Sequence, residues 1–204
     1  MFYQKRREYI QKSILDTSIQ LFRKNGYEAT TVEEIAKTVG VAKGTIYNFY
    51  NSKRDILMCW AYQVFQGMDF QQAFSPDRTV QQNMNTMIDL LEGYMASEEK
   101  LFIQFLHEFM STYEASIADN QFEFKKIMTR VIESSKDYET FNRSSKNLKI
   151  DILNDALFMG VIHWFDQGKT VEGLNQYLKN ILKICLFGML NKGRLKNEDS
   201  RRSR

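Results

Sequence analysis

Polar side chains between residues 43 and 48 have the chemistry to hold a phosphate chain and to read the edges of bases. Lys43 offers a cation and Tyr47 a phenolic hydroxyl, and both groups bind phosphate oxygens. Asn48 can form two hydrogen bonds with an adenine edge, and the Thr45 methyl group can contact a thymine methyl. The alternative is that Thr45 and Tyr47 pack within their own domain. Whether these residues contact DNA or pack internally depends on the helix that carries them.

Residues 31–50 are predicted to form two short helices joined by a tight turn at Gly40. Thr30 and Thr31 each suit a helix N-cap, because each has a glutamate three residues further on. The predicted buried positions are Val32, Ile35, Ala36, Val39, Ile46 and Tyr50, and the predicted outward positions of the second helix are Lys43, Gly44, Thr45, Tyr47 and Asn48. Two helices joined by a short glycine-containing turn are typical of a helix-turn-helix, whose second helix can enter a DNA major groove.

The same stretch resembles the DNA-binding domain of the tetracycline-repressor (TetR) family. The resemblance lies in the run T-x-x-x-I-A-x-x-x-G-V-x-K-G-T-I-Y, followed by N-F-Y-N-S-K-R-D-I-L and preceded by L-F-R-K-N-G-Y-E-A-T-T. It covers roughly residues 8–58 and implies a dimeric regulator that binds a palindromic operator in double-stranded DNA. It also implies that the outward residues Lys43 to Asn48 lie at the groove, with Thr31 and Lys53 on the flanking phosphates.

Three departures from the family pattern lie close to the residues predicted to read DNA, Lys43 to Asn48, which form the predicted reading edge. Ala42 stands where the family often has a serine cap, and Asn48 replaces a common histidine. Phe49 and Tyr50 reverse the frequent order of the two aromatic residues. The operator sequence therefore does not carry over from the family. Gly44 lowers helix stability, which is justified if the helix end must approach a sugar-phosphate chain closely.

The N-terminal quarter of the chain is basic. Residues 1–54 hold ten Lys/Arg and five Asp/Glu, a net charge of +5, and residues 55–204 hold eighteen and twenty, a net of −2. Residues 5–24 are predicted to form an amphipathic helix closed by Asn25 and Gly26. Lys5, Arg6 and Arg7 at its start oppose the helix dipole, so stability does not explain them. Contact with a phosphate backbone and a solvated arm both remain open.

The rest of the chain shows repeated helical periodicity. Ser52 and Asp55 are predicted to cap a long connecting helix over residues 52–74, and Ser75-Pro76 is predicted to break it and start the next helix. Further helices are expected from that break, from Glu98, from about Asn120, and over residues 148–166 and 171–190, with a polar loop at 142–147.

The predicted fold is all-α, with about nine helices in two domains and a tail. Residues 1–54 would form a three-helix DNA-binding domain, linked by the helix over residues 52–74. Residues 55–191 would form a helical bundle for effector binding and dimerisation. Residues 192–204 are polar and basic, and are expected to be a disordered tail.

The last two predicted helices are the most apolar, and their apolar faces are broader than one core stripe needs. The excess favours a dimer interface in which each chain contributes two helices to a four-helix bundle. The alternative is that this pair forms only the domain's own core. The residues predicted for the interface are Leu153, Leu157, Gly160, Val161, Leu178, Ile181, Cys185 and Gly188.

Soft and aromatic side chains on the central helices could line an adaptable pocket for a small apolar or amphipathic effector. His107 could serve there as a polar anchor. The alternative for each residue is a plain core position, which is also the usual place of a lone histidine on an apolar helix. The candidates are Met68, Met84, Met87, Phe105, His107, Met110, Tyr113, Phe158 and Trp164.

The sequence offers little to an enzyme. Its two histidines, His107 and His163, lack partners at zinc-motif spacing, and no nucleophile elbow, Walker loop or dinucleotide fingerprint occurs. No metal, cofactor, signal peptide or membrane span is expected, and two unpatterned cysteines suit a reducing cytoplasm. The sequence thus predicts a cytoplasmic transcriptional regulator that represses its genes. Binding of the effector is expected to release it from DNA. The alternative is a helical small-molecule sequestering protein whose helix-turn-helix no longer reads DNA.

Overall fold

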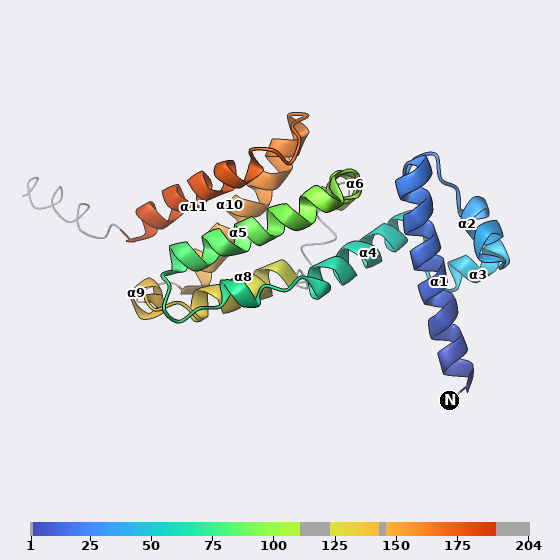
Figure 1. Cartoon of the computed structure of the whole chain (residues 1–204), viewed down its shortest axis with the longest axis horizontal. Helices are drawn as coiled ribbons and strands as arrows, with labels where there is room; N and C mark the ends of the chain where they lie inside the picture. Colours follow the sequence, from blue (N-terminus) through green and yellow to red (C-terminus); the bar gives the residue numbers. More distant parts are fainter. Residues whose placement is uncertain (1, 111–122, 143–145, 191–204) are drawn as a thin grey trace, which may run out of the picture. The chain divides into compact units, whose positions relative to one another are not determined.

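The computed structural model describes residues 2–110, 123–142 and 146–190. Within these ranges the chain is entirely helical, with ten α-helices and one short 3₁₀ turn and no strand (Figure 1). The predicted all-α class is therefore confirmed. The short helix α9 (Tyr138–Asn142) was not predicted, because five residues are too few to show a periodicity.

The contacts divide the chain into two compact units, each made of two segments. The first unit combines the residues up to Met68 with a segment that begins at Glu98. The second unit combines a segment that begins at Asp69 with another that begins at Phe122. In the first unit α1 packs on α2, α4 and α6, α2 packs on α3, and α4 packs on α6. Its helices are α1 (Phe2–Asn25), α2 (Val32–Val39), α3 (Lys43–Tyr47), α4 (Lys53–Gly67) and α6 (Glu99–Met110).

The capping residues and the turn glycine predicted from the sequence are found at the helix ends of this first unit. The Thr31 hydroxyl caps α2 by accepting a hydrogen bond from the Glu34 N–H at 3.1 Å. Gly40 adopts the left-handed conformation at φ 80°, where its N–H reaches the Ala36 carbonyl. Ser52 caps α4 through the Asp55 N–H at 3.1 Å. Local sequence therefore fixes where these helices begin and turn.

Two groups of apolar side chains hold the first unit together. Ile14, Ile35 and Ile46 join the three N-terminal helices and are almost fully buried. Trp60 and Phe65 of α4 meet Phe102 of α6 edge to face, with ring centroids 5.6 and 5.9 Å apart. Burying each such side chain contributes about 1.5–3 kcal/mol, so α6 is firmly part of this unit.

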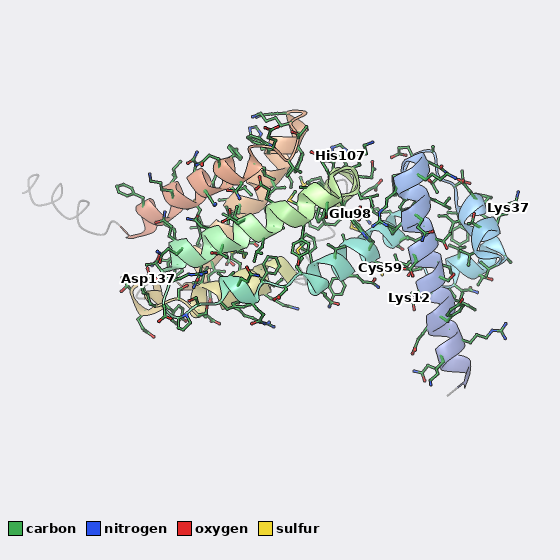
Figure 2. The ribbon with its side chains drawn as sticks, viewed as in Figure 1. Lys12, Lys37, Cys59, Glu98, His107 and Asp137 are labelled. Carbon is green, nitrogen blue, oxygen red and sulfur yellow. The ribbon has the colours of Figure 1, made fainter. Side chains whose placement is uncertain are left out.

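The second unit is a bundle in which α5 packs on α8 and α11, and α10 packs on α8 and α11. Its interior is mostly apolar, with Asn83, Ser135 and Lys149 as buried polar residues, and Figure 2 draws the described side chains on the ribbon. The predicted stripe of α5 is buried, from Val80 through Met95. The elements are η1 (Gln71–Ala73), α5 (Val80–Ser97), α8 (Glu123–Glu133), α9, α10 (Lys146–Asp166) and α11 (Leu174–Leu190).

Two predictions about the centre of the chain were wrong. The helix predicted to run to Phe74 ends at Gly67, after which Met68 is extended and Phe70 turns into the core. Pro76 does not begin a helix. Instead α5 begins at Val80, whose N–H donates to the Asp137 carboxylate at 2.7 Å. Thr79 and Gln82 form a capping box at this helix start, where the Gln82 side chain accepts the Thr79 N–H at 3.0 Å and the Thr79 hydroxyl accepts the Gln82 N–H at 3.2 Å. The Asp137 carboxylate, 57 residues away in sequence, adds a tertiary contact to this local cap.

The other helix boundaries differ from the predicted ones by a few residues. Helix α6 begins at Glu99, α10 at Lys146 and α11 at Leu174. Helix α11 starts three residues later than predicted because the Val171 carbonyl accepts a turn hydrogen bond from the Leu174 N–H. Part of the predicted loop at 142–147 and the predicted tail at 192–204 lie outside the described residues.

Candidate DNA-binding surface

Helices α2 and α3 form a small scaffold with one buried and one exposed side. Ile35, Ala36 and Ile46 are buried, and Gly40 makes the turn between the helices. The structure leaves Lys43, Gly44, Tyr47 and Asn48 exposed and Thr45 half-buried. These five predicted residues therefore lie together on one short element. Ala42 caps α3 without a side-chain hydrogen bond, as the missing serine hydroxyl requires.

Lys43 is held beside Tyr47 before any partner binds. Its ammonium forms an ion pair with Glu33 of α2 and lies 5.8 Å from the centre of the Tyr47 ring. The hydrogen bond that Lys43 donates to the Glu33 carboxylate raises the pKa of Lys43, and the same bond lowers the pKa of Glu33. Because both groups are solvent-exposed, the pair is weak, and a phosphate can replace the carboxylate.

Gly44 faces open space. A Cβ placed on it would meet no heavy atom of the described chain within 4 Å, and its backbone is ordinary helix. The fold therefore gives no reason for a glycine in a helix, where it costs about 1 kcal/mol relative to alanine. This favours the predicted close approach of an external partner at that position.

Thr31 and Lys53, predicted to hold flanking phosphates, both have structural partners. Thr31 is exposed and uses its oxygen to cap α2, which leaves its O–H able to donate. The Lys53 ammonium donates to the carbonyls of Tyr27, Thr30 and Glu28 at 2.5, 3.2 and 3.4 Å. Lys53 thus closes the connection between α1 and α2, a role that sequence did not indicate, and its phosphate contact stays a prediction.

A groove of about 570 Å³ lies between the N-terminal end of α1 and α3. The Arg7 guanidinium carbon lies 5.6 Å from the centre of the Phe49 ring, within cation–π range. Sequence separation hid this arrangement, since the two sides of the groove are more than thirty residues apart. The groove is lined by Arg6, Arg7, Ile10, Thr45, Asn48 and Phe49.

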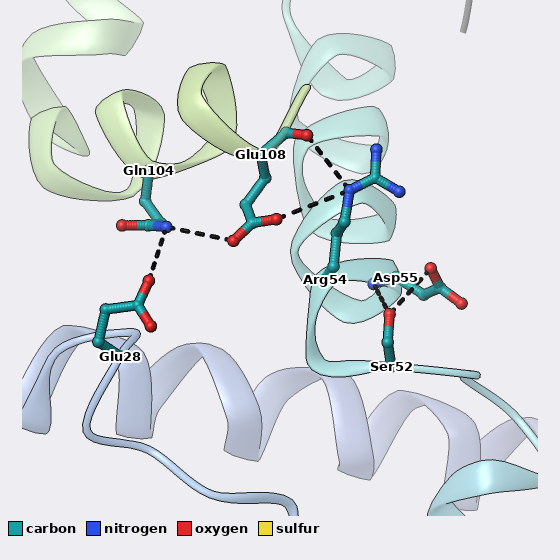
Figure 3. A network of polar contacts seen from close by, with 6 residues as sticks. All are labelled: Glu28, Ser52, Arg54, Asp55, Gln104 and Glu108. Carbon is teal, nitrogen blue, oxygen red and sulfur yellow. Dashed lines mark hydrogen bonds and ion pairs between the residues drawn. The ribbon is translucent and has the colours of Figure 1, made fainter. Parts of the chain in front are cut away.

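Polar contacts join α6 to the rest of the first unit (Figure 3). The Arg54 Nε donates to the Glu108 carbonyl at 3.2 Å and lies 3.7 Å from its carboxylate. Gln104 Nε2 donates to the Glu108 carboxylate at 3.4 Å and to the Glu28 carboxylate at 3.3 Å. Arg23 of α1 forms an ion pair with Glu98. Sequence reasoning missed these residues because no local motif connects α1, α4 and α6.

Tyr27 belongs to the same network. Burial and a hydrogen bond with Glu108 raise the pKa of its phenol. The Lys53 ammonium lies 4.2 Å from the centre of its ring, and the Phe22 ring meets it edge to face at 5.0 Å. Tyr27 therefore contacts α1, α4 and α6 from the connection that leads into α2.

The residues predicted to line an effector pocket are distributed over both units. In the first unit Met68 and Phe105 are buried and Met110 is half-buried, while His107 is exposed. In the second unit Met84 and Met87 are fully buried in α5. Tyr113 lies outside the described residues. The shared pocket stays a prediction.

The remaining two candidates lie on α10. Phe158 is half-buried, and the Trp164 indole N–H donates to the Thr170 carbonyl at 2.6 Å. The Trp164 ring also packs on Tyr177 with centroids 5.1 Å apart. Trp164 therefore closes the turn that joins α10 to α11, a structural role that its sequence position did not reveal.

Most residues predicted for the dimer interface belong to the core of the single chain. Leu153, Leu157, Gly160, Val161 and Leu178 are buried where α10 packs on α11, which is the alternative left open for this helix pair. A Cβ on Gly160 would lie 2.6 Å from Ile181 Cδ1, so the glycine does let the two helices approach closely. Ile181 and Cys185 are half-buried, and Gly188 is exposed.

Other apolar side chains of α10 and α11 are exposed instead. Ile152 and Met159 are 44% and 42% exposed on α10, and Ile184 and Phe187 are 72% and 69% exposed on α11. Ile152 and Met159 are seven residues apart, so they lie on the same side of their helix. Ile184 and Phe187 are three residues apart and likewise lie on one side of α11.

Both histidines are exposed, which corrects the expectation of core positions. His163 Nε2 lies 2.6 Å from Gln167 Nε2, in the turn that follows α10. Among the described side chains, no group of three or more His, Cys, Asp or Glu residues could hold a metal ion. No helix in the described ranges is long and apolar enough to cross a membrane.

A buried two-helix scaffold with a cationic, hydrogen-bonding outer edge defines a helix-turn-helix DNA-binding protein. Residues 14–58 match the family model described as bacterial regulatory proteins of the tetR family. Residues 14–58 therefore carry a DNA-binding domain of the tetR type, as the sequence resemblance predicted.

Similar proteins agree with this assignment. The fatty acid metabolism regulator protein of Bacillus subtilis is 46% identical over 55 residues, which are 27% of each chain. IcaR of Staphylococcus epidermidis, the negative transcriptional regulator of the biofilm operon icaADBC, is 29% identical over 89% of this chain and 97% of its own. The crystal structure of the repressor FadR from Thermus thermophilus, in complex with lauroyl-CoA, has a TM-score of 0.72. It is 22% identical, covering 88% of this chain and 95% of its own.

Proposed function

We propose that this protein is a dimeric transcriptional repressor that binds a palindromic operator and is released by a small apolar or amphipathic effector. The observation that supports it most is the outer edge of α3. There Lys43, Tyr47 and Asn48 are exposed together, and Gly44 leaves open space at the centre. One such edge contacts only a few base pairs, so two copies are needed for specific binding.

The second copy is proposed to dock on the exposed apolar side chains of α10 and α11. Ile152, Met159, Ile184 and Phe187 would pair with their counterparts across a two-fold axis and form a four-helix bundle. Such a dimer would place its two α3 helices about 34–36 Å apart, the spacing of successive major grooves on one side of DNA. The proposed interface therefore consists of exposed residues of α10 and α11, in place of the buried residues of the same helices that the sequence predicted.

A fatty acyl thioester is the first effector class to test. FadR of Thermus thermophilus was crystallised with lauroyl-CoA, and its fold covers most of this chain. The acyl chain of such a ligand suits adaptable apolar side chains, which Met84 and Met87 provide in α5. A ligand of this kind releases DNA only through a higher affinity for a conformation that does not fit the operator.

Helices α4 and α6 are proposed to transmit the response. Helix α6 begins two residues after α5 ends, and it contacts α1, α4 and the connection into α2 through Glu98, Gln104 and Glu108. A displacement of α6 would therefore move the scaffold that carries α3.

The function is tested by selecting bound duplexes from a random pool and measuring affinity for the selected sequence by fluorescence anisotropy. Tyr47→Ala and Lys43→Ala should each weaken binding at least several-fold. Tyr62→Ala is the matched control, since Tyr62 of α4 is 44% exposed and Tyr47 45%; Lys183→Ala on α11 is the control for charge. Selection of no preferred sequence, or unchanged affinity in both α3 variants, would contradict the proposal and favour a sequestering protein.

A further inference from the structure

We propose that Arg6 and Arg7 of α1 form a second DNA-contacting site, in which their guanidinium groups hold backbone phosphates beside the groove read by α3. The inference rests on the proposed function and adds a contact to it. The family model begins at residue 14, so both arginines lie upstream of the matched domain. The site is the groove between the start of α1 and α3.

The first turns of α1 are not needed to build the core of the domain. From residue 4 onward, where the side chains of α1 are described, the first buried residue is Ile14, and residues 4–9 are exposed. Figure 1 shows α1 running on past α3 toward the N-terminus. Arg6 and Arg7 lie in the second turn of α1, near the positive end of the helix dipole, so the dipole gives neither arginine a stabilising role.

Both guanidinium groups are available to an anion. In the described part of the chain neither Arg6 nor Arg7 forms an ion pair with a carboxylate. Arg7 lies over the Phe49 ring, and stacking on an aromatic face orients a guanidinium while leaving its N–H groups outward. An oriented, planar donor set of this kind matches the oxygens of a phosphate.

The groove continues the surface that α3 presents to DNA. The arginines form its α1 side, and Thr45 and Asn48 of the reading edge form its α3 side. A sugar-phosphate strand bordering the major groove is the polyanion that would lie beside α3 when Asn48 contacts a base. Charge and position therefore both favour the operator backbone over a small anion.

The helix itself provides a matched control. Successive residues advance about 100° around an α-helix, which places Lys5 and Lys12 on the side of α1 opposite Arg6, Arg7 and Ile10. Both lysines are exposed, and Figure 2 shows Lys12 on the side of α1 away from α3. Removing the two lysines takes away the same charge from the same helix without touching the groove.

The experiment compares the unsubstituted protein, Arg6→Ala/Arg7→Ala and Lys5→Ala/Lys12→Ala on the selected duplex over a range of salt concentrations. Each lost phosphate contact makes the slope of log affinity against log salt shallower by about 0.9. The salt slope of the arginine variant should be shallower by the amount expected for two lost contacts in every protomer bound. Its affinity at low salt should also be weaker by tenfold or more. The lysine variant should keep a slope close to that of the unsubstituted protein.

A third variant tests the stacking. Phe49→Leu keeps an apolar side chain but removes the ring under Arg7, and it should give part of the affinity loss of the arginine pair. Equal slopes for the arginine and lysine variants would overturn the inference, because general charge alone would then explain both. A loss that varied with the A·T content of the flanking base pairs would also overturn it, since minor-groove insertion and not phosphate contact has that dependence.

The same measurements separate this inference from the proposed function. If Tyr47→Ala abolishes sequence-specific binding while the arginine variant behaves like the unsubstituted protein, the regulator stands and the second site fails. If none of the proteins binds a preferred duplex, the proposed function fails. Thermal unfolding of each variant checks that the substitutions leave the core intact, as their exposed positions lead one to expect.

Discussion

The guanidinium Nε of Arg54 on α4 lies 3.2 Å from the backbone carbonyl of Glu108 and 3.7 Å from its carboxylate on α6. Both side chains are less than a third exposed. The same carboxylate accepts hydrogen bonds from Gln104 and Tyr27. Glu108 therefore gives α6 polar contacts with both α4 and the connection into α2.

Replacing Glu108 by alanine should weaken the link between α6 and the DNA-binding helices. We expect a loss of about 1–3 kcal/mol in the free energy of unfolding, because hydrogen bonds to a charged, partly buried group are removed. The ratio of operator affinities without and with effector should also shrink. Anisotropy titrations at saturating and zero lauroyl-CoA measure this ratio, with Glu172→Ala as an exposed control on the turn before α11. An unchanged ratio would rule out Glu108 as a coupling residue.

Gly44→Ala separates the needs of the fold from those of DNA. A Cβ at residue 44 meets open space, so the variant should be as stable as the unsubstituted protein or more stable by up to about 1 kcal/mol. Its operator affinity should nevertheless fall several-fold, because the added methyl group would stand between the helix and the sugar-phosphate chain. Denaturant unfolding and anisotropy together test this. A stable variant with full affinity would show that nothing approaches Gly44 closely.

Lys53→Met should destabilise the protein even when no DNA is present. Three backbone carbonyls lose their shared donor, and we expect the free energy of unfolding to fall by about 1–3 kcal/mol. If Lys53 also binds a phosphate, the salt slope of operator affinity will become shallower by about 0.9 per contact. Urea unfolding and salt titration thus measure the two roles separately. Unchanged stability would contradict the structural role.

Ile184→Asp and Phe187→Asp should convert a dimer into monomers. Each places a charge at the centre of the proposed interface, where desolvation opposes association. Native mass spectrometry measures the masses, and operator affinity should fall with dimerisation. Tyr62→Asp is the control, because it puts the same charge on an exposed aromatic position of the first unit. Dimers that persist in both α11 variants would place the interface elsewhere.

Alkaline titration should distinguish two tyrosines from the exposed ones. Burial raises the pKa of both Tyr27 and Tyr50 above the ordinary phenol value. A raised pKa in the folded state means that the neutral phenol contributes stability below about pH 10 and that this stability is lost as pH rises further. Absorbance at alkaline pH should show a delayed tyrosine component that coincides with unfolding. Tyr27→Phe should reduce its amplitude, and a single unshifted titration would contradict the structure.

The sequence by itself determined the helix-turn-helix and the all-α class. Thr31, Gly40 and Ser52 act on neighbours within four residues, and the apolar periodicity of α2 and α5 shows directly which side is buried. Local hydrogen bonding and periodicity are properties of short segments, so they can be recognised without a fold. The family resemblance rests on the same segments.

Tertiary structure decided what depends on contacts between distant segments. The Asp137 carboxylate reaches the Val80 N–H at the start of α5 from a distant segment, and the apolar residues of α10 divide into buried Leu153 and exposed Ile152 only when α11 is in place. Helix α6 adds polar contacts to the N-terminal unit through Glu108, and Arg7 of α1 comes to lie over the Phe49 ring, just after α3. Periodicity gives each helix an apolar side, but the partner that covers that side is set by packing between elements far apart in the chain.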